Sequence, residues 1–167
     1  MTIARLCTLL MISATLLIGA VDRVDGQTKY GVSVKTVKPA ALTTVKTYTW
    51  KASTPAPDKR VDAMIVAAVE RELSTRGLMK LASGTGDVLV TYASVQRTDV
   101  DLKKAEKNGS LPEFSVGTLV VDLSNPKEEV LFRVRMDTPF DRDRATIEAT
   151  INQVVAEMFA KYPAPKR

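Results

Sequence analysis

The stretch Lys46-Thr47-Tyr48-Thr49-Trp50, followed by the break Pro55-Ala56-Pro57, decides the fold of this chain. Threonine and aromatic residues favour β-structure, and alternation places Tyr48 and Trp50 on one face of a strand. The prolines then end that strand, because proline has no amide hydrogen to donate. We therefore expect residues 42–50 to form the first strand of one domain, with Tyr48 and Trp50 as structural anchors of its core.

A helix is predicted directly after this break. Asp58 is a favourable N-cap residue, because its carboxylate can accept hydrogen bonds from free amides of the first turn. Gly77 is a favourable residue just beyond the helix C-terminus, where a left-handed conformation is common. Between them, apolar residues recur at helical spacing, as expected for a helix with one buried face: Val61, Met64, Ile65, Ala68, Val69 and Leu73.

Four further strands follow, and their alternation of apolar and polar residues identifies them. They are expected at residues 78–82, 87–98, 114–123 and 130–136. In the last strand, Phe132 points inward as a structural anchor, whereas Leu131, Arg133 and Arg135 point outward. The last two strands are expected to form an antiparallel hairpin.

A second amphipathic helix closes the domain. Asp141 or Asp143 is expected to cap its N-terminus, and Pro163 and Pro165 end it. The expected order is thus strand, helix, four strands, helix. This order predicts the α+β class: a two-layer α/β sandwich, with a mixed, mainly antiparallel sheet of about five strands and two helices on one face. The domain spans residues 42–163, and residues 164–167 are a tail.

The N-terminal region resembles a secretory signal. Arg5 precedes an apolar run that is too short to span a bilayer comfortably. We expect a signal peptide over residues 1–26, cleaved after Gly26, with cleavage after Ala20 as the alternative. Cys7 lies at the start of the apolar run, so we expect no lipid anchor. Residues 27–41 are expected to form a flexible tether, with a loose edge strand as the alternative.

Composition excludes several kinds of chemistry. The chain has 167 residues, no histidine and one cysteine, Cys7, within the leader. The mature chain therefore lacks the side chains for a Ser-His or Cys-His nucleophile pair or a histidine- or cysteine-based zinc site. We expect no enzyme activity and no cofactor. The net charge of +5 is spread among acidic residues, which argues against nucleic-acid binding.

Several short motifs together resemble a known family, the domain-of-unknown-function family 4136, whose members are small bacterial envelope proteins and lipoproteins. The resemblance covers about residues 42 to 163. The motifs are Tyr48-Thr49-Trp50, Arg76-Gly77-Leu78, Asp87-Val88-Leu89-Val90-Thr91-Tyr92, Gly117-Thr118-Leu119-Val120-Val121-Asp122-Leu123 and Lys161-Tyr162-Pro163.

The chain departs from the family pattern at two points. Phe132-Arg133-Val134 replaces the usual Trp-Arg-Gly, and no cysteine that could be lipidated precedes the domain. The resemblance implies an address in the cell envelope, and it brings no catalytic residues. We therefore expect an exported protein, periplasmic or extracellular, without a lipid anchor or a stable membrane span after signal cleavage.

The first functional hypothesis is a non-catalytic binding or scaffolding module. Leu131, Arg133 and Arg135 would form a basic, partly apolar surface for an envelope protein or an anionic envelope component. Two solvated arginines on an ordinary outer face are the simpler interpretation.

Two other functions are open. Strands with apolar residues on both faces would suit a carrier of an apolar ligand, although a central strand gives the same pattern. A hydrolase would need paired carboxylates at a defined separation. The candidate carboxylates are Asp87, Asp99, Asp101, Asp122, Asp137, Asp141 and Asp143.

Overall fold

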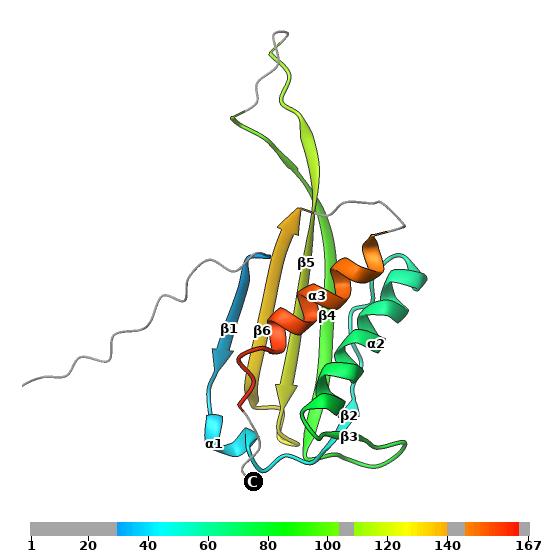
Figure 1. Ribbon diagram of the computed structural model, residues 1–167, viewed down its shortest axis with the longest axis vertical. Coiled ribbons are helices and arrows are strands. Elements are labelled where there is room, and N and C mark those ends of the chain that lie inside the picture. Colours follow the sequence, from blue (N-terminus) through cyan, green and yellow to red (C-terminus); the bar gives the residue numbers. More distant parts are fainter. Residues whose placement is uncertain (1–29, 104–108, 140–145, 164–167) are drawn as a thin grey trace, which may run out of the picture.

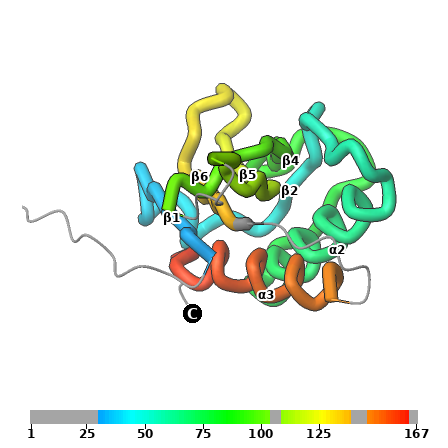
Figure 2. Tube along the Cα trace, turned by 90° about the horizontal axis from the view of Figure 1, so that it is seen from above, coloured from blue at the N-terminus to red at the C-terminus, as the bar shows by residue number. Residues whose placement is uncertain are grey.

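A computed structural model of the chain describes residues 30–103, 109–139 and 146–163. In these residues, six strands form one mixed sheet, and two long helices cover one of its faces (Figures 1 and 2). The strands are β1 (Val32–Thr36), β2 (Thr47–Trp50), β3 (Met79–Lys80), β4 (Val88–Val100), β5 (Glu113–Ser124) and β6 (Val130–Pro139). The helices are α1 (Pro39–Leu42), α2 (Lys59–Thr75) and α3 (Ile147–Phe159). The predicted α+β class is confirmed, with one more strand and one more short helix than expected.

The strand order across the sheet is β1-β6-β5-β4-β2-β3. Among the first four strands in this order, β1, β6, β5 and β4, neighbours are antiparallel. Strand β2 runs parallel to both β4 and β3. The parallel pairs exist because α2 carries the chain over the sheet between β2 and β3. The sheet thus consists of an antiparallel part, β1, β6, β5 and β4, and of two short parallel strands, β2 and β3, which α2 connects.

The predicted anchors lie in the core beneath the two helices. Tyr48 and Phe132 are buried, and Trp50 is half-buried. The Trp50 ring meets the Tyr48 and Tyr92 rings edge to face, at centroid distances of 6.4 and 5.7 Å. Its indole nitrogen donates to Glu70 of α2 at 2.7 Å. Trp50 therefore connects the sheet to α2 through both packing and a hydrogen bond.

Helix α2 begins and ends where the sequence predicts. Asp58 Oδ1 accepts from the amides of Arg60 and Val61, at 2.8 and 3.4 Å. At the other end, Gly77 has a φ of +81°, and the Leu78 amide donates to the Leu73 carbonyl at 3.0 Å. This hydrogen bond belongs to the Schellman motif, which the free φ of glycine makes accessible.

The Arg-Gly-Leu motif has a second role beside ending α2. The Arg76 guanidinium donates to the Phe159 carbonyl of α3 at 2.6 Å and pairs with Glu72 at the same distance. It therefore satisfies a carbonyl at the C-terminal end of α3 and fixes the ends of the two helices side by side.

Two expectations about boundaries need correction. Residues 32–36 form β1, so the predicted tether over 27–41 is wrong there, and the edge-strand alternative is what the structure shows. Leu42 is a buried residue of α1 rather than the start of a strand. Helix α3 begins at Ile147, and the predicted caps Asp141 and Asp143 lie outside the described residues, as do the leader and the tail.

Strands β4 and β5 extend beyond the body of the sheet as an arm (Figure 1). The body ends where the neighbouring chain segments stop pairing: Ser94 bonds to Thr54 on one side, and Val116 pairs with Pro139 on the other. We define the arm as residues 95–103 and 109–115. Among the described residues, β4 pairs with β5 alone from Val95 to Val100, and the arm residues of β5, Glu113 to Ser115, pair with β4 alone.

Candidate functional site

The surface predicted around Arg133 and Arg135 is an array of ion pairs. Arg133 makes two hydrogen bonds to Asp122, at 2.7 and 2.6 Å, and Arg135 makes two to Asp137, at 2.6 and 3.0 Å. Leu131 is only 5% exposed and belongs to the core, so its predicted place in an exposed patch is corrected. Both arginine charges are thus matched by neighbouring carboxylates.

Asp137 is the centre of this array. Its carboxylate also accepts from the Thr118 hydroxyl and lies 3.6 Å from the Arg97 guanidinium. The hydrogen bond from Arg135 is the main reason why the pKa of Asp137 is below its usual value. Because cations and carboxylates alternate, this face offers little net attraction to an anionic partner.

The predicted catalytic carboxylates have structural partners. Asp87 accepts from the amides of Lys46 and Thr47, both at 3.0 Å, and so caps the start of β2. Asp99 pairs with Arg97 at 3.0 Å, and Asp101 accepts from the Lys103 amide at 3.0 Å. With Asp122 and Asp137 in the ion-pair array, five of the predicted carboxylates bind groups of the chain itself. Asp141 and Asp143 lie outside the described residues.

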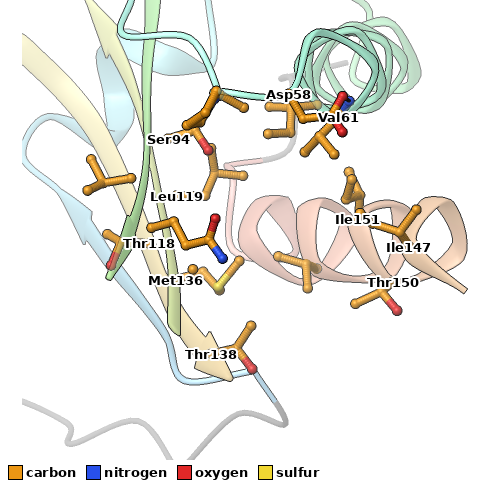
Figure 3. A pocket seen from close by; sticks show the side chains of 17 residues that line it. Asp58, Val61, Ser94, Thr118, Leu119, Met136, Thr138, Ile147, Thr150 and Ile151 are labelled. Atoms are coloured by element: carbon orange, nitrogen blue, oxygen red, sulfur yellow. Dashed lines mark hydrogen bonds between the residues drawn. The ribbon is translucent and has the colours of Figure 1, made fainter. Parts of the chain in front are cut away.

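A cleft with a volume of about 370 Å³ opens between the sheet and the two long helices, next to the root of the arm. We call it the α2–α3 cleft. Figure 3 shows Leu119 and Met136 of the sheet facing Ile147 and Ile151 of α3 and Val61 of α2. These apolar side chains form most of its wall.

The floor of the cleft consists of two rows of residues across the sheet. The inner row is Ser94–Leu119–Met136, and the outer row, nearer the arm, is Gln96–Gly117–Thr138. Each row takes one residue from β4, one from β5 and one from β6. The register therefore brings together positions that are far apart in the sequence.

The roof is held by a hydrogen-bonded junction below the first turn of α2. Asp62 accepts from the Ala56 amide at 2.8 Å and from the hydroxyl of buried Tyr92. Burial, and then this hydrogen bond to Asp62, raise the pKa of Tyr92 far above its usual value, so its hydroxyl stays protonated as the donor. The junction ties the Pro-rich segment and α2 to β4 and so positions Val61 above the floor.

Besides Asp58 and Thr118, whose side chains bond to groups of the protein, four polar side chains line the cleft: Ser94, Gln96, Thr138 and Thr150. Within the residues that the structure describes, none of the four side chains makes a hydrogen bond to the protein. Their donors and acceptors therefore remain available to a bound molecule.

Residue types restrict what the site can bind. Among the described residues, no group of three or more His, Cys, Asp or Glu side chains is arranged to hold a metal ion.

Over the same ranges, no helix combines the length and apolar character required to cross a membrane.

The arm carries exposed apolar residues. Leu102 is 75% exposed and Phe114 38%, and Val95, Val100 and Leu111 are exposed as well. An isolated two-stranded ribbon is marginally stable in water, so a partner that covers these side chains would stabilise the arm.

Sequence reasoning missed the α2–α3 cleft, although one signal was present. On the helix-facing side of β4, the apolar series Val88, Val90 and Tyr92 changes to Ser94 and Gln96. A change to polar residues along the buried face of a strand marks the point at which the helices stop covering it completely.

The comparisons with known proteins agree on the fold. The family model for a domain of unknown function, DUF4136, matches residues 32–164. Among curated proteins, none matches the chain.

Two solved structures are similar to the chain. A PDZ domain protein from Parabacteroides distasonis has a TM-score of 0.55 at 12% identity; the match covers 83% of this chain but 36% of that one. A PelC dodecamer from Paraburkholderia phytofirmans has a TM-score of 0.54 at 12% identity, covering 81% of this chain and 99% of that one. At such low identity, these likenesses show the fold alone.

Proposed function

The chain belongs to the DUF4136 family, and we propose that it is a non-catalytic binding protein of the bacterial cell envelope that holds an apolar ligand in the α2–α3 cleft. The observation that carries this proposal is the cleft of about 370 Å³ between the sheet and α2 and α3. The apolar leader at residues 1–26 and the family resemblance support the envelope address.

The size and chemistry of the cleft support a small ligand. Ligand sites usually have volumes of about 300–1,000 Å³ and combine apolar walls with a few polar groups. The walls here are isoleucine, valine, leucine and methionine side chains from both layers. Burial of an alkyl chain against them gains about 0.8 kcal/mol for each CH₂ group removed from water.

The lining also supports binding without catalysis. Its reactive groups are hydroxyls, one amide and the carboxylate of Asp58, which caps α2. None of these hydroxyls has a histidine as a general base, because the chain contains no histidine.

A variant that fills the cleft tests this function. Thr138→Trp places an indole on the outer row of the floor, and Thr91→Trp is the matched control, because Thr91 lies on the opposite face of the sheet, across from Asp122. The readout is the fluorescence of the neutral apolar dye N-phenyl-1-naphthylamine on titration. We expect saturable binding to the wild type and the control, and at least about tenfold weaker binding to Thr138→Trp. Equal binding by both folded variants would overturn the proposal.

The arm favours a second function, assembly with further copies of the chain. Its exposed apolar residues, among them Leu102 and Phe114, would be covered by a neighbouring copy. The similar fold described as a PelC dodecamer supports this proposal, because that fold is compatible with a closed assembly.

Sedimentation velocity of the mature protein tests assembly. We expect an oligomer that the double variant Leu102→Ser/Phe114→Ser converts to a monomer. Val37→Ser is the control, since Val37 is 49% exposed but distant from the arm in the sheet. A wild-type monomer at all concentrations, or an oligomer that persists in the double variant, contradicts the assembly role of the arm.

A further inference from the structure

The floor of the α2–α3 cleft changes in polarity from one row to the next. The inner row consists of Ser94, Leu119 and Met136, so two of its three side chains are apolar. The outer row consists of Gln96, Gly117 and Thr138, and its central glycine has no side chain. A molecule that lies along the floor would therefore meet apolar surface at one end and hydrogen-bonding groups at the other.

The helices contribute mainly apolar side chains and one hydroxyl to the roof. Ile65, Ile151 and Val154 line the cleft from the helices, and Thr150 of α3 contributes a hydroxyl. The hydroxyls of Thr138 and Thr150 and the amide of Gln96 make no hydrogen bonds to described residues. Such groups bind donors and acceptors of a ligand without losing a bond inside the protein.

Among the described residues, the lining contains almost no charge. Of the 17 residues that line the cleft, only Asp58 is ionisable, and its Oδ1 atom accepts from the first turn of α2. The neighbouring Lys59 and Arg60 are exposed and do not line the cleft. Arg97, the next charged residue along β4, pairs with Asp99. An anionic group inside the cleft would therefore lack a cation among the described lining residues.

From these observations we infer that the ligand is an amphiphile with an apolar part and an uncharged hydrogen-bonding head, such as an alcohol, ester or amide. This inference rests on the proposed function. The apolar part lies against Leu119, Met136 and the helix residues, and the head lies over the outer row of Gln96, Gly117 and Thr138. Neutral heads are favoured because burial of an unpaired carboxylate or ammonium loses more hydration than the hydroxyls and amide return.

Three compounds with the same chain length and different heads test the inference. Dodecan-1-ol, dodecanoate and dodecylammonium each compete with N-phenyl-1-naphthylamine for the wild-type protein at pH 8, below the solubility limit of the alcohol and the micellar concentrations of the two ions. We expect the alcohol to displace the dye at a concentration at least about tenfold lower than either ion, because only the neutral head avoids the cost of burying a charge.

Two near-isosteric variants locate the head. Thr138→Val and Gln96→Leu remove hydrogen-bonding groups of the outer row, and Thr91→Val removes a hydroxyl from the opposite face of the sheet as the matched control. We expect dodecanol to bind about three- to tenfold more weakly to the two outer-row variants, as the loss of one net hydrogen bond predicts. The Thr91→Val control and the affinity for the dye should stay unchanged.

The outcomes separate the two proposals. If the dye does not bind to the wild type, the proposed function fails. If the dye binds but the three compounds displace it equally, or an ion displaces it best, the apolar site stands and the uncharged head is overturned. If dodecanol is preferred but the outer-row variants bind it normally, the placement of the head over this row is wrong.

Discussion

Asp62 joins three segments of the chain through one carboxylate. It lies on α2, accepts from the Ala56 amide in the Pro-rich segment and accepts from the Tyr92 hydroxyl on β4. Because Tyr92 is 7% exposed, water cannot readily replace this hydrogen bond. The roof of the cleft therefore depends on this hydrogen bond between the two layers.

Tyr92→Phe tests this contact. We expect the free energy of unfolding to fall by about 1–3 kcal/mol, because the variant removes a buried hydrogen bond to a carboxylate. Urea denaturation measures the change. Tyr30→Phe is the control, since the Tyr30 hydroxyl bonds to Gln153 at an exposed position and should matter less. Equal losses of unfolding free energy in the two variants would show that the buried hydrogen bond to Asp62 stabilises the fold no more than the exposed one does.

Asp87 gives a prediction about pH. The hydrogen bond from the Lys46 amide is the main reason why the pKa of Asp87 lies below its usual value. A carboxyl whose pKa is lower in the folded state stabilises the fold above the unfolded pKa of about 4, and this contribution disappears as the pH falls through the folded pKa. We expect Asp87→Ala to cost about 1 kcal/mol or less at pH 7, since the group is exposed.

The difference between wild type and Asp87→Ala should be constant above about pH 5 and should shrink below about pH 4. Urea denaturation at pH 7, 5 and 3 measures it. A difference that is the same at all three pH values would show that the ionised carboxylate is not what stabilises the start of β2.

At the scale of elements, α2 has the most clearly defined ends, because Asp58 caps its N-terminus and Gly77 follows its C-terminus. We expect Asp58→Ala to lower the free energy of unfolding by about 1 kcal/mol, because the first turn loses its side-chain acceptor. Asp58→Ser retains an acceptor and should recover most of this loss, while Lys59→Ala controls for a change at the same turn. Thermal unfolding of the three variants compares them; no recovery by serine would assign the effect to charge rather than capping.

Most elements could be predicted because their signals are local. The limits of α2 follow from Asp58 and Gly77, and the three long strands follow from alternation along each of them. Strand β1 was predicted only as the alternative to a tether, because Val32, Val34 and Thr36 alternate with Ser33 and Lys35 in a short, polar stretch. Such a strand is defined by its pairing with β6, which local sequence does not encode.

The candidate site could be predicted only in part. The outward direction of Arg133 and Arg135 follows from alternation, but their pairing with Asp122 and Asp137 depends on the register between β5 and β6. The cleft depends on the same register and on the placement of both helices. Leu131 was misplaced because it is buried although it alternates with the inward-facing Phe132.

For the whole molecule, β1 closes one edge of the sheet. Val32 and Val34 pack against the core, and β1 pairs along its length with β6, from Val32–Met136 to Thr36–Phe132. We expect deletion of residues 1–29 to leave the stability of the domain unchanged, whereas deletion of residues 1–36 should cost about 2–4 kcal/mol from lost apolar burial alone. Thermal unfolding of both truncated proteins measures this. Equal stability of the two truncated proteins would show that β1, like a tether, does not stabilise the domain.

The pairing of β1 with β6 also bears on how the chain folds. Val34 pairs with Val134, so the pairing of β1 with β6 closes a loop that contains most of the domain. Strands β5 and β6, in contrast, are joined by a short turn at Asn125 to Glu129. Long loops close at a greater entropic cost, so local hairpins are favoured early in folding. The meander of β5 and β6 should therefore be structured in the transition state, and β1 should dock after the rate-limiting step, so that substitutions in β1 accelerate unfolding and leave the folding rate nearly unchanged.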